Sequence, residues 1–393
     1  MTGVLDGIRV IDFGRYIAGP WCGAILGDFG ADVIRIERID GGEDRWVSPV
    51  TDDGVGAMFL QCNRNKRCLT LNPLKPAGRE IVAKLVAGAD VVVANLPPET
   101  LIGMGLDYTL RGYKPDIILT TVNMWGSGGE WSHKLGFDGL AQAASGNLYM
   151  AGPEGQPTRA AAPYVDFSTA TLSALATIAA LRHRDQTGEG QFLEGALLRT
   201  AVTWMTPTLI EEDLLQIGRV SSHNRGQTAG PADVVATKDG HVLVSVIGAF
   251  QFERFANMIG KPELVNDDRF KDDQARGDNG TLLSAHLQVW ASERTNDEVL
   301  AAMEQAKVPC GPVLSPRQAL DNTHINQIGI FEEVEYPTAA KPVRIARFPV
   351  TMSATPGTIR RRAPQLGEHT NEVLAELGYD AAAIVNLRAE RIV

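Results

Sequence analysis

The sequence is poor in the residues that build disulfide frameworks and zinc sites. Its 393 residues include four cysteines, Cys22, Cys62, Cys68 and Cys310, and no two of them form a CxxC pair. The histidines do not cluster either. Because both kinds of site need closely grouped cysteines or histidines, we expect free thiols and no metal site.

Long apolar runs and long basic runs are also missing. Residues 1–7 have neither a basic start nor an apolar stretch, and no window approaches the apolar length that crosses a bilayer. The net charge is −10, and the run Arg360-Arg361-Arg362 is short and typical of a solvated face. We therefore expect a soluble, cytoplasmic protein that binds neither membrane nor nucleic acid.

Strand-like and helix-like segments alternate through the first third of the chain. The segments with strand composition are Ile8–Phe13, Asp32–Glu37, Ala89–Asn95 and Pro115–Val122. Alternation of this kind predicts a parallel sheet that helices cover on both faces. Ligands of such sheets bind beyond the carboxyl ends of the strands, where Phe13-Gly14-Arg15, Glu37-Arg38 and Asn95-Leu96 fall.

The turn after the first strand lacks the glycine spacing of a dinucleotide site. It reads Gly14-Arg15-Tyr16-Ile17-Ala18-Gly19 and contains no GxGxxG. Without that spacing the backbone does not offer a pyrophosphate its usual close approach, so we do not expect a nicotinamide cofactor.

Asp166 directly precedes a helical run, Phe167–Arg184. In that position an Asp is most often an N-cap whose carboxylate accepts backbone N–H bonds. Small and apolar residues nearly surround the run, so we expect a buried helix with a partly dehydrated start. Helix-end N–H groups would favour the anionic form of Asp166, and such a carboxylate can also act as a nucleophile.

The pattern changes at about Pro231, after a polar stretch, 218–230, that reads as a linker or mobile loop. Val234–Thr237 and His241–Val246 predict a hairpin with its turn at Asp239-Gly240. Helical segments follow, so we expect a second, α+β domain.

Several stretches, taken in order, point to one family. They are Gly14–Glu37, Asn65–Leu71, Ala89–Leu96, Gly136-Phe137-Asp138 through Gly146, Asp166–Gln191, Lys238-Asp239-Gly240 and Ala363–His369. Together they resemble the class III coenzyme A-transferases, which include formyl-CoA transferase and carnitine CoA-transferase. The resemblance spans nearly the whole chain.

The resemblance implies an α/β fold with a Rossmann-like, parallel-sheet large domain and a smaller α+β domain, in an interlocked homodimer. Residues 1–200 and 330–393 would form the large, coenzyme A-binding domain, and residues 231–329 the small domain. Residues 201–230 would form a linker and loop.

Asp166 is the nucleophile that the resemblance implies. It would take the acyl group of an acyl-CoA as an anhydride, and then coenzyme A as an aspartyl thioester, without a tightly bound cofactor. The implied coenzyme A contacts are Ile17, Ala18, Arg38, Leu71, Asn95, Leu96 and Met104. The implied substrate and loop residues are Arg15, Phe137, Gly226 and Gly230. An ordinary ion pair with Glu37 or Asp40 is the alternative for Arg38, and ordinary core packing is the alternative for Leu71, Leu96 and Met104.

Positions at which this chain differs from the family's usual residues narrow the range of possible substrates. Ile17 stands where formyl-CoA transferases have Gln, which disfavours formate and oxalate, and the acceptor is then a dicarboxylate of the itaconate, mesaconate or succinate type, or a carnitine-like acid. Gly103 replaces an Arg, and the missing phosphate contact would come from Arg15, Lys66 or Arg67. An α-methylacyl-CoA racemase needs a His where this chain has Phe137, and a non-catalytic acyl-CoA-binding protein is the other alternative.

Overall fold

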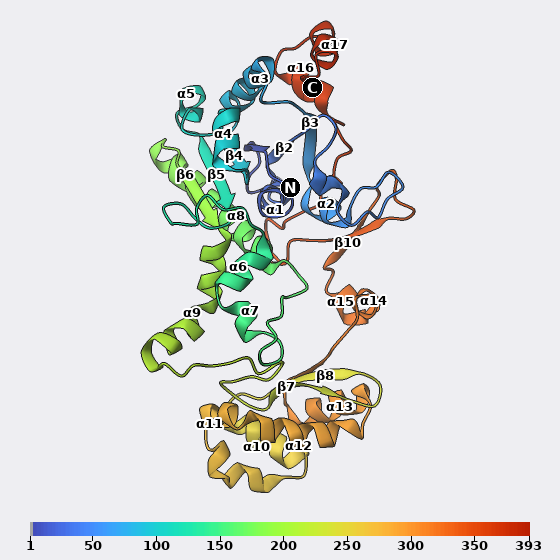
Figure 1. Ribbon diagram of the computed structural model, residues 1–393. Helices are drawn as coiled ribbons and strands as arrows, with labels where there is room; N and C mark the ends of the chain where they lie inside the picture. Colours follow the sequence, from blue (N-terminus) through green and yellow to red (C-terminus); the bar gives the residue numbers. More distant parts are fainter. Residues whose placement is uncertain (1–2) are drawn as a thin grey trace. The chain divides into compact units, whose positions relative to one another are not determined.

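The computed structural model describes residues 3–393, which form two compact units (Figure 1). The large unit contains residues 3–145, 160–206 and 326–393. The small unit contains residues 146–159 and 207–325. Each unit has its own hydrophobic core.

A six-stranded, wholly parallel sheet forms the centre of the large unit. The strands are β1 (Arg9–Asp12), β2 (Asp32–Glu37), β3 (Lys66–Thr70), β4 (Val91–Ala94), β5 (Ile118–Asn123) and β6 (Phe192–Ala196). Their order across the sheet is β3-β2-β1-β4-β5-β6, the order of doubly wound Rossmann folds. The predicted Rossmann-like α/β fold is therefore confirmed. The direction of winding reverses between β1 and β4, the point at which such sheets bind ligands.

Alternate residues of the central strands enter two different cores. In β1, Val10 packs into one core and Ile11 into the other, and in β4 Val91 and Val92 divide in the same way. Successive side chains of a strand point to opposite faces, so one core lies on each face of the sheet. Helices α1 (Ala18–Asp28) and α8 (Tyr164–Thr187) supply one core, and α3 (Pro76–Ala87) supplies the other.

The C-terminal segment returns to this sheet. Helices α16 (Thr370–Glu376) and α17 (Ala381–Ala389) lie beside α3 in Figure 1 and share its core. The His369 N–H donates to the carbonyl of Cys68 at 3.0 Å, and the Asn72 N–H donates to that of Ile392 at 2.8 Å. The two ends of the sequence thus belong to one folding unit.

The rest of the large unit consists of short elements around the sheet. They are η1 (Glu43–Trp46), α2 (Ala57–Cys62), α4 (Pro98–Met104), α5 (Leu110–Tyr113), α6 (Asp138–Ala144), the first part of α9 (Leu197–Leu215), and the antiparallel pair β10 (Phe331–Val334) and β11 (Val343–Ala346). Helix α15 (Thr323–Gln327) lies where the chain passes from the small unit to the large one.

The small unit is an antiparallel sheet packed on helices. Its strands are β7 (Ala232–Ala236), β8 (His241–Ser245) and β9 (Cys310–Pro312). Its other elements are α7 (Asn147–Met150), α10 (Ala249–Met258), η2 (Pro262–Asn266), η3 (Asp268–Phe270), α11 (Asp273–Asp278), α12 (Gly280–Ser292), α13 (Asn296–Ala306) and α14 (Pro316–Asp321). Thr295 and Glu298 form a reciprocal capping box at the start of α13.

Two sequence expectations need correction. The sequence predicts a helix over Leu193–Leu215, but the start of this segment forms strand β6 and the helix begins at Leu197. Helix α8 is long and apolar enough to span a membrane by length and composition, with a mean hydropathy of 1.3, although it packs against α1, β5 and β6 inside the large unit. Stretch 218–230 contains neither helix nor strand, as expected of a loop, and in it the Gly226 N–H donates to the Ala232 carbonyl at 2.7 Å and the Gln227 amide donates to that of Val220 at 2.8 Å.

Candidate functional site

The turn after β1 is fixed to the end of β4 by one amide side chain. The Oδ1 atom of Asn95 accepts the Arg15 N–H at 2.6 Å, and the Nδ2 atom donates to the Arg15 carbonyl at 2.8 Å. A Cβ atom on Gly19 would lie 2.7 Å from the Gly14 Cα and 2.9 Å from the Asn95 Oδ1. Close packing of two glycines and an amide therefore shapes this turn at the point where the sheet reverses its winding.

A buried ion network lies beneath the same turn. Lys66 Nζ contacts Asp12 Oδ2 at 2.7 Å, and Arg35 contacts Asp44 at 2.7 Å and Glu37 at 3.1 Å, with all five side chains almost fully buried. Burial raises the pKa of Asp12, but Lys66 and Arg35 outweigh it, so the pKa lies below its ordinary value. The network fixes the positions of β1, β2 and β3 relative to one another.

This network also bears on the missing phosphate contact. Lys66 is enclosed by its acceptors, and Arg67 forms ion pairs with Asp32, Glu372 and Glu376. Neither side chain is free for a phosphate. Arg15 is different, because its Nε and Nη2 atoms have no hydrogen-bond partner within residues 3–393. Burial and the nearby Arg35 lower the pKa of Arg15, which means that its charged form is destabilised. An anion bound beside Arg15 would stabilise that charged form.

Tyr16 connects this turn to the segment before α6. Its backbone is left-handed, with φ of 59°, and its N–H donates to Asp44 of the ion network at 3.3 Å. Its ring meets the ring of Phe137 edge to face, with centroids 5.6 Å apart. Phe137 is 64% exposed and directly precedes Asp138, the first residue of α6. Two segments about 120 residues apart in sequence thus meet at this aromatic pair.

Asp166 lies within the first turn of α8 and does not cap it. The helix begins at Tyr164, and its N-cap position, Pro163, makes no side-chain cap bond. The cap comes from another helix, since Oδ2 of Asp138 accepts the N–H groups of Val165 at 2.8 Å and Asp166 at 3.0 Å. The interpretation of Asp166 as an N-cap is therefore wrong. Its half-buried carboxylate accepts no hydrogen bond from the residues that the structure describes.

The electrostatic setting of Asp166 differs from the expected one. Burial, followed by the negative charge of Asp138, raises its pKa to about 7. The helix-end N–H groups were expected to favour the anion, but Asp138 occupies them. Asp166 therefore changes protonation state near neutral pH, as a basic and weakly solvated carboxylate does.

Apolar packing encloses the start of α8. Val165, fully buried, lies in one cluster with Ala18, the first residue of α1, and with Met124 after β5, Ala141 of α6 and Leu197 of α9. Two residues further along α8, the ring of Phe167 meets that of Trp21 at 5.1 Å, edge to face. Asp166, between Val165 and Phe167, thus sits at the carboxyl-end edge of the sheet, close to the start of α1 with Ile17 and Ala18.

The other predicted contacts have varied surroundings. Arg38 is exposed and forms an ion pair with Glu43 at 2.7 Å, a partner different from the two considered in the sequence. Leu71 is 1% exposed in the core, and Leu96 and Met104 pack against that core. Gly226 and Gly230 belong to the small unit.

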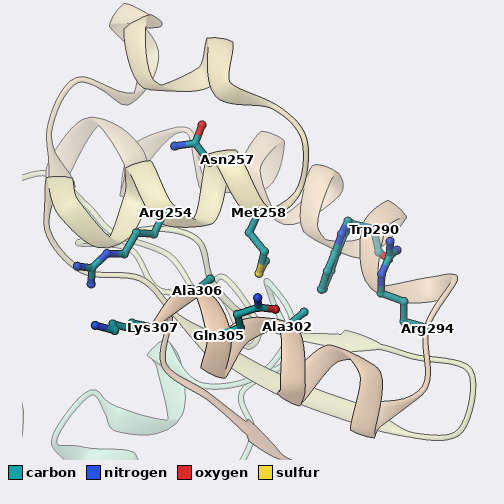
Figure 2. A pocket seen from close by; sticks show the side chains of 9 residues that line it. All are labelled: Arg254, Asn257, Met258, Trp290, Arg294, Ala302, Gln305, Ala306 and Lys307. Atoms are coloured by element: carbon teal, nitrogen blue, oxygen red, sulfur yellow. The ribbon is translucent and has the colours of Figure 1, made fainter.

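A hollow of about 770 Å³ lies entirely in the small unit, between α10, α12 and α13. Figure 2 shows Met258 at its centre, with Arg254 and Lys307 on one side and Trp290 and Arg294 on the other. None of its lining residues is a predicted site residue, and Arg294 is engaged by the Trp290 ring and carbonyl. The residues that line this hollow thus belong to the small unit, whereas Asp166 belongs to the large unit.

Comparison with known proteins shows the family of the chain. The model of CoA-transferase family III matches residues 5–370. The chain belongs to this family. A succinate–glutarate CoA-transferase of Agrobacterium fabrum is 33% identical over 95% of both chains. A succinyl-CoA:mesaconate CoA-transferase of Haloarcula marismortui is also 33% identical, over 96% of this chain and 97% of that one.

A solved structure supports the fold of this family III CoA-transferase. The crystal structure of a CaiB/BaiF family protein from Brucella suis superposes with a TM-score of 0.84 at 28% identity, covering 96% of this chain and 100% of that one. The class predicted from the sequence, a CoA-transferase enzyme whose substrates are coenzyme A thioesters and carboxylic acids, is therefore confirmed.

Two residues of the site escaped the sequence interpretation. Tyr16 gave no signal, because positive φ is uncommon outside glycine and tyrosine is not among the residue types enriched there. Asp138 did give one, since it ends the family-like segment Gly136-Phe137-Asp138. Its cap on α8 joins residues 27 and 28 positions apart, a tertiary contact that the motif alone does not reveal.

Proposed function

We propose that this CoA-transferase moves coenzyme A between succinate and a second short dicarboxylic acid, with Asp166 as the covalent nucleophile. The observation that carries the mechanism is the Asp166 carboxylate itself, half-buried, free of hydrogen bonds to the described residues and with a raised pKa. The two relatives above, one named for succinate and glutarate and one for mesaconate, support the choice of acids. The departure at Ile17 agrees with that choice.

The carboxylate performs the exchange in four balanced steps. An oxygen of Asp166 attacks the thioester carbonyl carbon, the carbon–sulfur bond breaks, and a mixed anhydride and coenzyme A thiolate form. The thiolate attacks the Asp166 carbonyl carbon and releases the first acid. The acceptor carboxylate then attacks the carbonyl carbon of the aspartyl thioester, the carbon–sulfur bond breaks, and a second mixed anhydride and coenzyme A thiolate form. The thiolate attacks the acceptor's acyl carbon in this anhydride, the carbon–oxygen bond to Asp166 breaks, and the new acyl-CoA and the free Asp166 carboxylate result. Each step is an acyl substitution that leaves all oxidation states unchanged, so no redox chemistry is required.

Binding roles follow from the positions of the predicted residues. We assign coenzyme A to the large unit, along Ile17-Ala18, Asn95-Leu96 and Arg38, with Leu71 and Met104 shaping the floor from the core. Arg15 has free guanidinium donors beside the same turn, and we assign it to an anionic group of the substrate. The interlocked homodimer, the cytoplasmic location, and the roles of Phe137, Gly226 and Gly230 stay predictions from the sequence.

Loss of the nucleophile tests this function. Asp166→Ala should abolish transfer from succinyl-CoA to glutarate or mesaconate, while coenzyme A binding, measured by calorimetry, stays within a few-fold of the wild type. Incubation of the wild type with succinyl-CoA and hydroxylamine should label Asp166 in a peptide map. Full transfer by the Ala variant would overturn the proposal, and so would label confined to other residues.

A further inference from the structure

We propose that Asp138 is a positioning residue that holds the start of α8 so that the Asp166 carboxylate stays unbonded and reactive. The inference rests on the proposed covalent role of Asp166. Asp138 does not contact the reacting atoms in this scheme. It acts through the backbone of α8 and through its charge.

The contacts of Asp138 give the first part of the argument. The first N–H groups of a helix have no partner within the helix and attract carboxylates. In α8, Oδ2 of Asp138 takes the N–H groups of Val165 and Asp166. Those donors are therefore not available to the neighbouring Asp166 carboxylate. A carboxylate that accepts several N–H bonds is stabilised as an anion and becomes a weaker base, so Asp138 protects the basicity of the nucleophile.

The second part is how Asp138 is held. Its other oxygen, Oδ1, accepts from the Nε2 atom of Gln142, one turn further along α6. The Oε1 atom of Gln142 in turn accepts the Ala160 N–H at 3.1 Å, in the segment that leads into α8. Asp138 and Gln142 are both buried. Helix α6 thus holds the segment before α8 through Gln142, and it holds the first turn of α8 through Asp138.

Charge gives the third part. The Asp138 and Asp166 carboxylates repel each other, and this repulsion is the second cause, after burial, of the raised pKa of Asp166. Both covalent states of Asp166, the anhydride and the thioester, are uncharged. Acylation therefore removes one of two facing negative charges, and Asp138 favours the covalent intermediates over the free enzyme.

Other titratable groups around α8 do not compete with this pair. They are Cys22 of α1, Cys62 of α2, Tyr164 of α8 itself, Glu194 of β6, and Arg184 with Asp90 and Asp116 at the far end. Burial raises the pKa of both thiols to about 12, and burial likewise raises the pKa of the Tyr164 phenol, so all three are neutral. Glu194 is paired with Arg199 at 2.9 Å.

The test is the pH dependence of Asp138→Asn. The amide oxygen can still accept the two N–H groups, so the helix keeps its cap while the charge is lost. We expect the acid limb of kcat/KM for succinyl-CoA to move about one pH unit lower, and kcat at pH 8 to fall several-fold. The ratio of variant to wild-type activity should then rise as the pH falls. Asp185→Asn, which removes a charge from the exposed far end of α8, should leave the acid limb unchanged.

A purely structural role for Asp138 would lower activity by the same factor at every pH, and that result would overturn the inference. If Asp138→Asn does not fold, single-turnover acylation of the wild type by succinyl-CoA decides the matter. An acid limb near pH 7 supports the inference, and a limb near pH 4 overturns it. Failure of the proposed function itself is distinguishable, because the wild type would then form no acyl-enzyme at any pH.

Discussion

The Asp166 side chain illustrates a conflict between reactivity and stability at the level of one residue. A carboxylate that is half-buried, beside another carboxylate and without a hydrogen bond is disfavoured as an anion. The fold keeps it there through contacts of its neighbours, with Val165 in the core and Phe167 against Trp21. Such a position is expected to weaken the folded state at the pH where the enzyme works.

Asp166→Asn should therefore stabilise the protein. With a folded-state pKa of about 7, Asp166 binds its proton more tightly in the folded than in the unfolded chain. Its stabilising contribution is complete below about pH 4 and is lost as the pH rises through about 7. Allowing for its access to solvent, we expect the Asn variant to gain about 1 to 2 kcal/mol at pH 8. Urea unfolding at pH 5 and pH 8 measures the change, and an equal gain at both pH values would contradict it.

At the scale of elements, the close approach of β5 and β6 depends on a glycine. A Cβ atom on Gly190, just before β6, would lie 2.3 Å from the Asp116 carbonyl oxygen and 2.4 Å from that of Ile117. Both are backbone atoms at the start of β5, so no side chain can move to make room. Gly190→Ala should destabilise the protein by about 3 kcal/mol, with a lower urea midpoint and an unchanged slope.

Gly112→Ala is the matched control for this substitution. A Cβ atom on Gly112, in α5, would meet nothing within 4 Å, and the backbone there is not left-handed. Because alanine loses less conformational freedom than glycine on folding, this variant should be neutral or more stable by up to about 1 kcal/mol. Equal destabilisation by both substitutions would show that the contacts at Gly190 are not the cause.

The elements also show how far the sequence could be interpreted. Strand β2 begins and ends where its strand composition predicts, at Asp32 and Glu37. Strand β6 was missed, since Phe192–Ala196 is short and runs directly into α9 without a turn residue. The charges of Lys66 and Arg67 suggested a phosphate site, but their partners come from distant segments, such as Asp12 and Glu376. Sequence patterns revealed local structure and suggested a candidate nucleophile, while the cap and the ion network depend on tertiary contacts.

At the scale of the whole molecule, the large unit is assembled from distant parts of the chain. Its sheet forms from residues 9–196, yet the core on one face includes Val373, Leu374, Ile384 and the terminal Ile392 and Val393. The intervening residues 207–325 build the small unit around a core of their own. The core on this face of the sheet therefore requires residues 373–393.

Leu374 tests this dependence. It lies on α16, is fully buried, and packs with the core that α3 supplies. Leu374→Ala should lower the free energy of unfolding by about 2 to 5 kcal/mol, because it leaves a cavity where two distant segments meet. Val385→Ala, on α17 and 62% exposed, is the control and should change stability by less than about 0.5 kcal/mol. Urea denaturation followed by tryptophan fluorescence measures both. A Leu374→Ala variant as stable as the control would mean that the C-terminal helices are an addition to the large unit, whereas the shared core predicts that they are part of it.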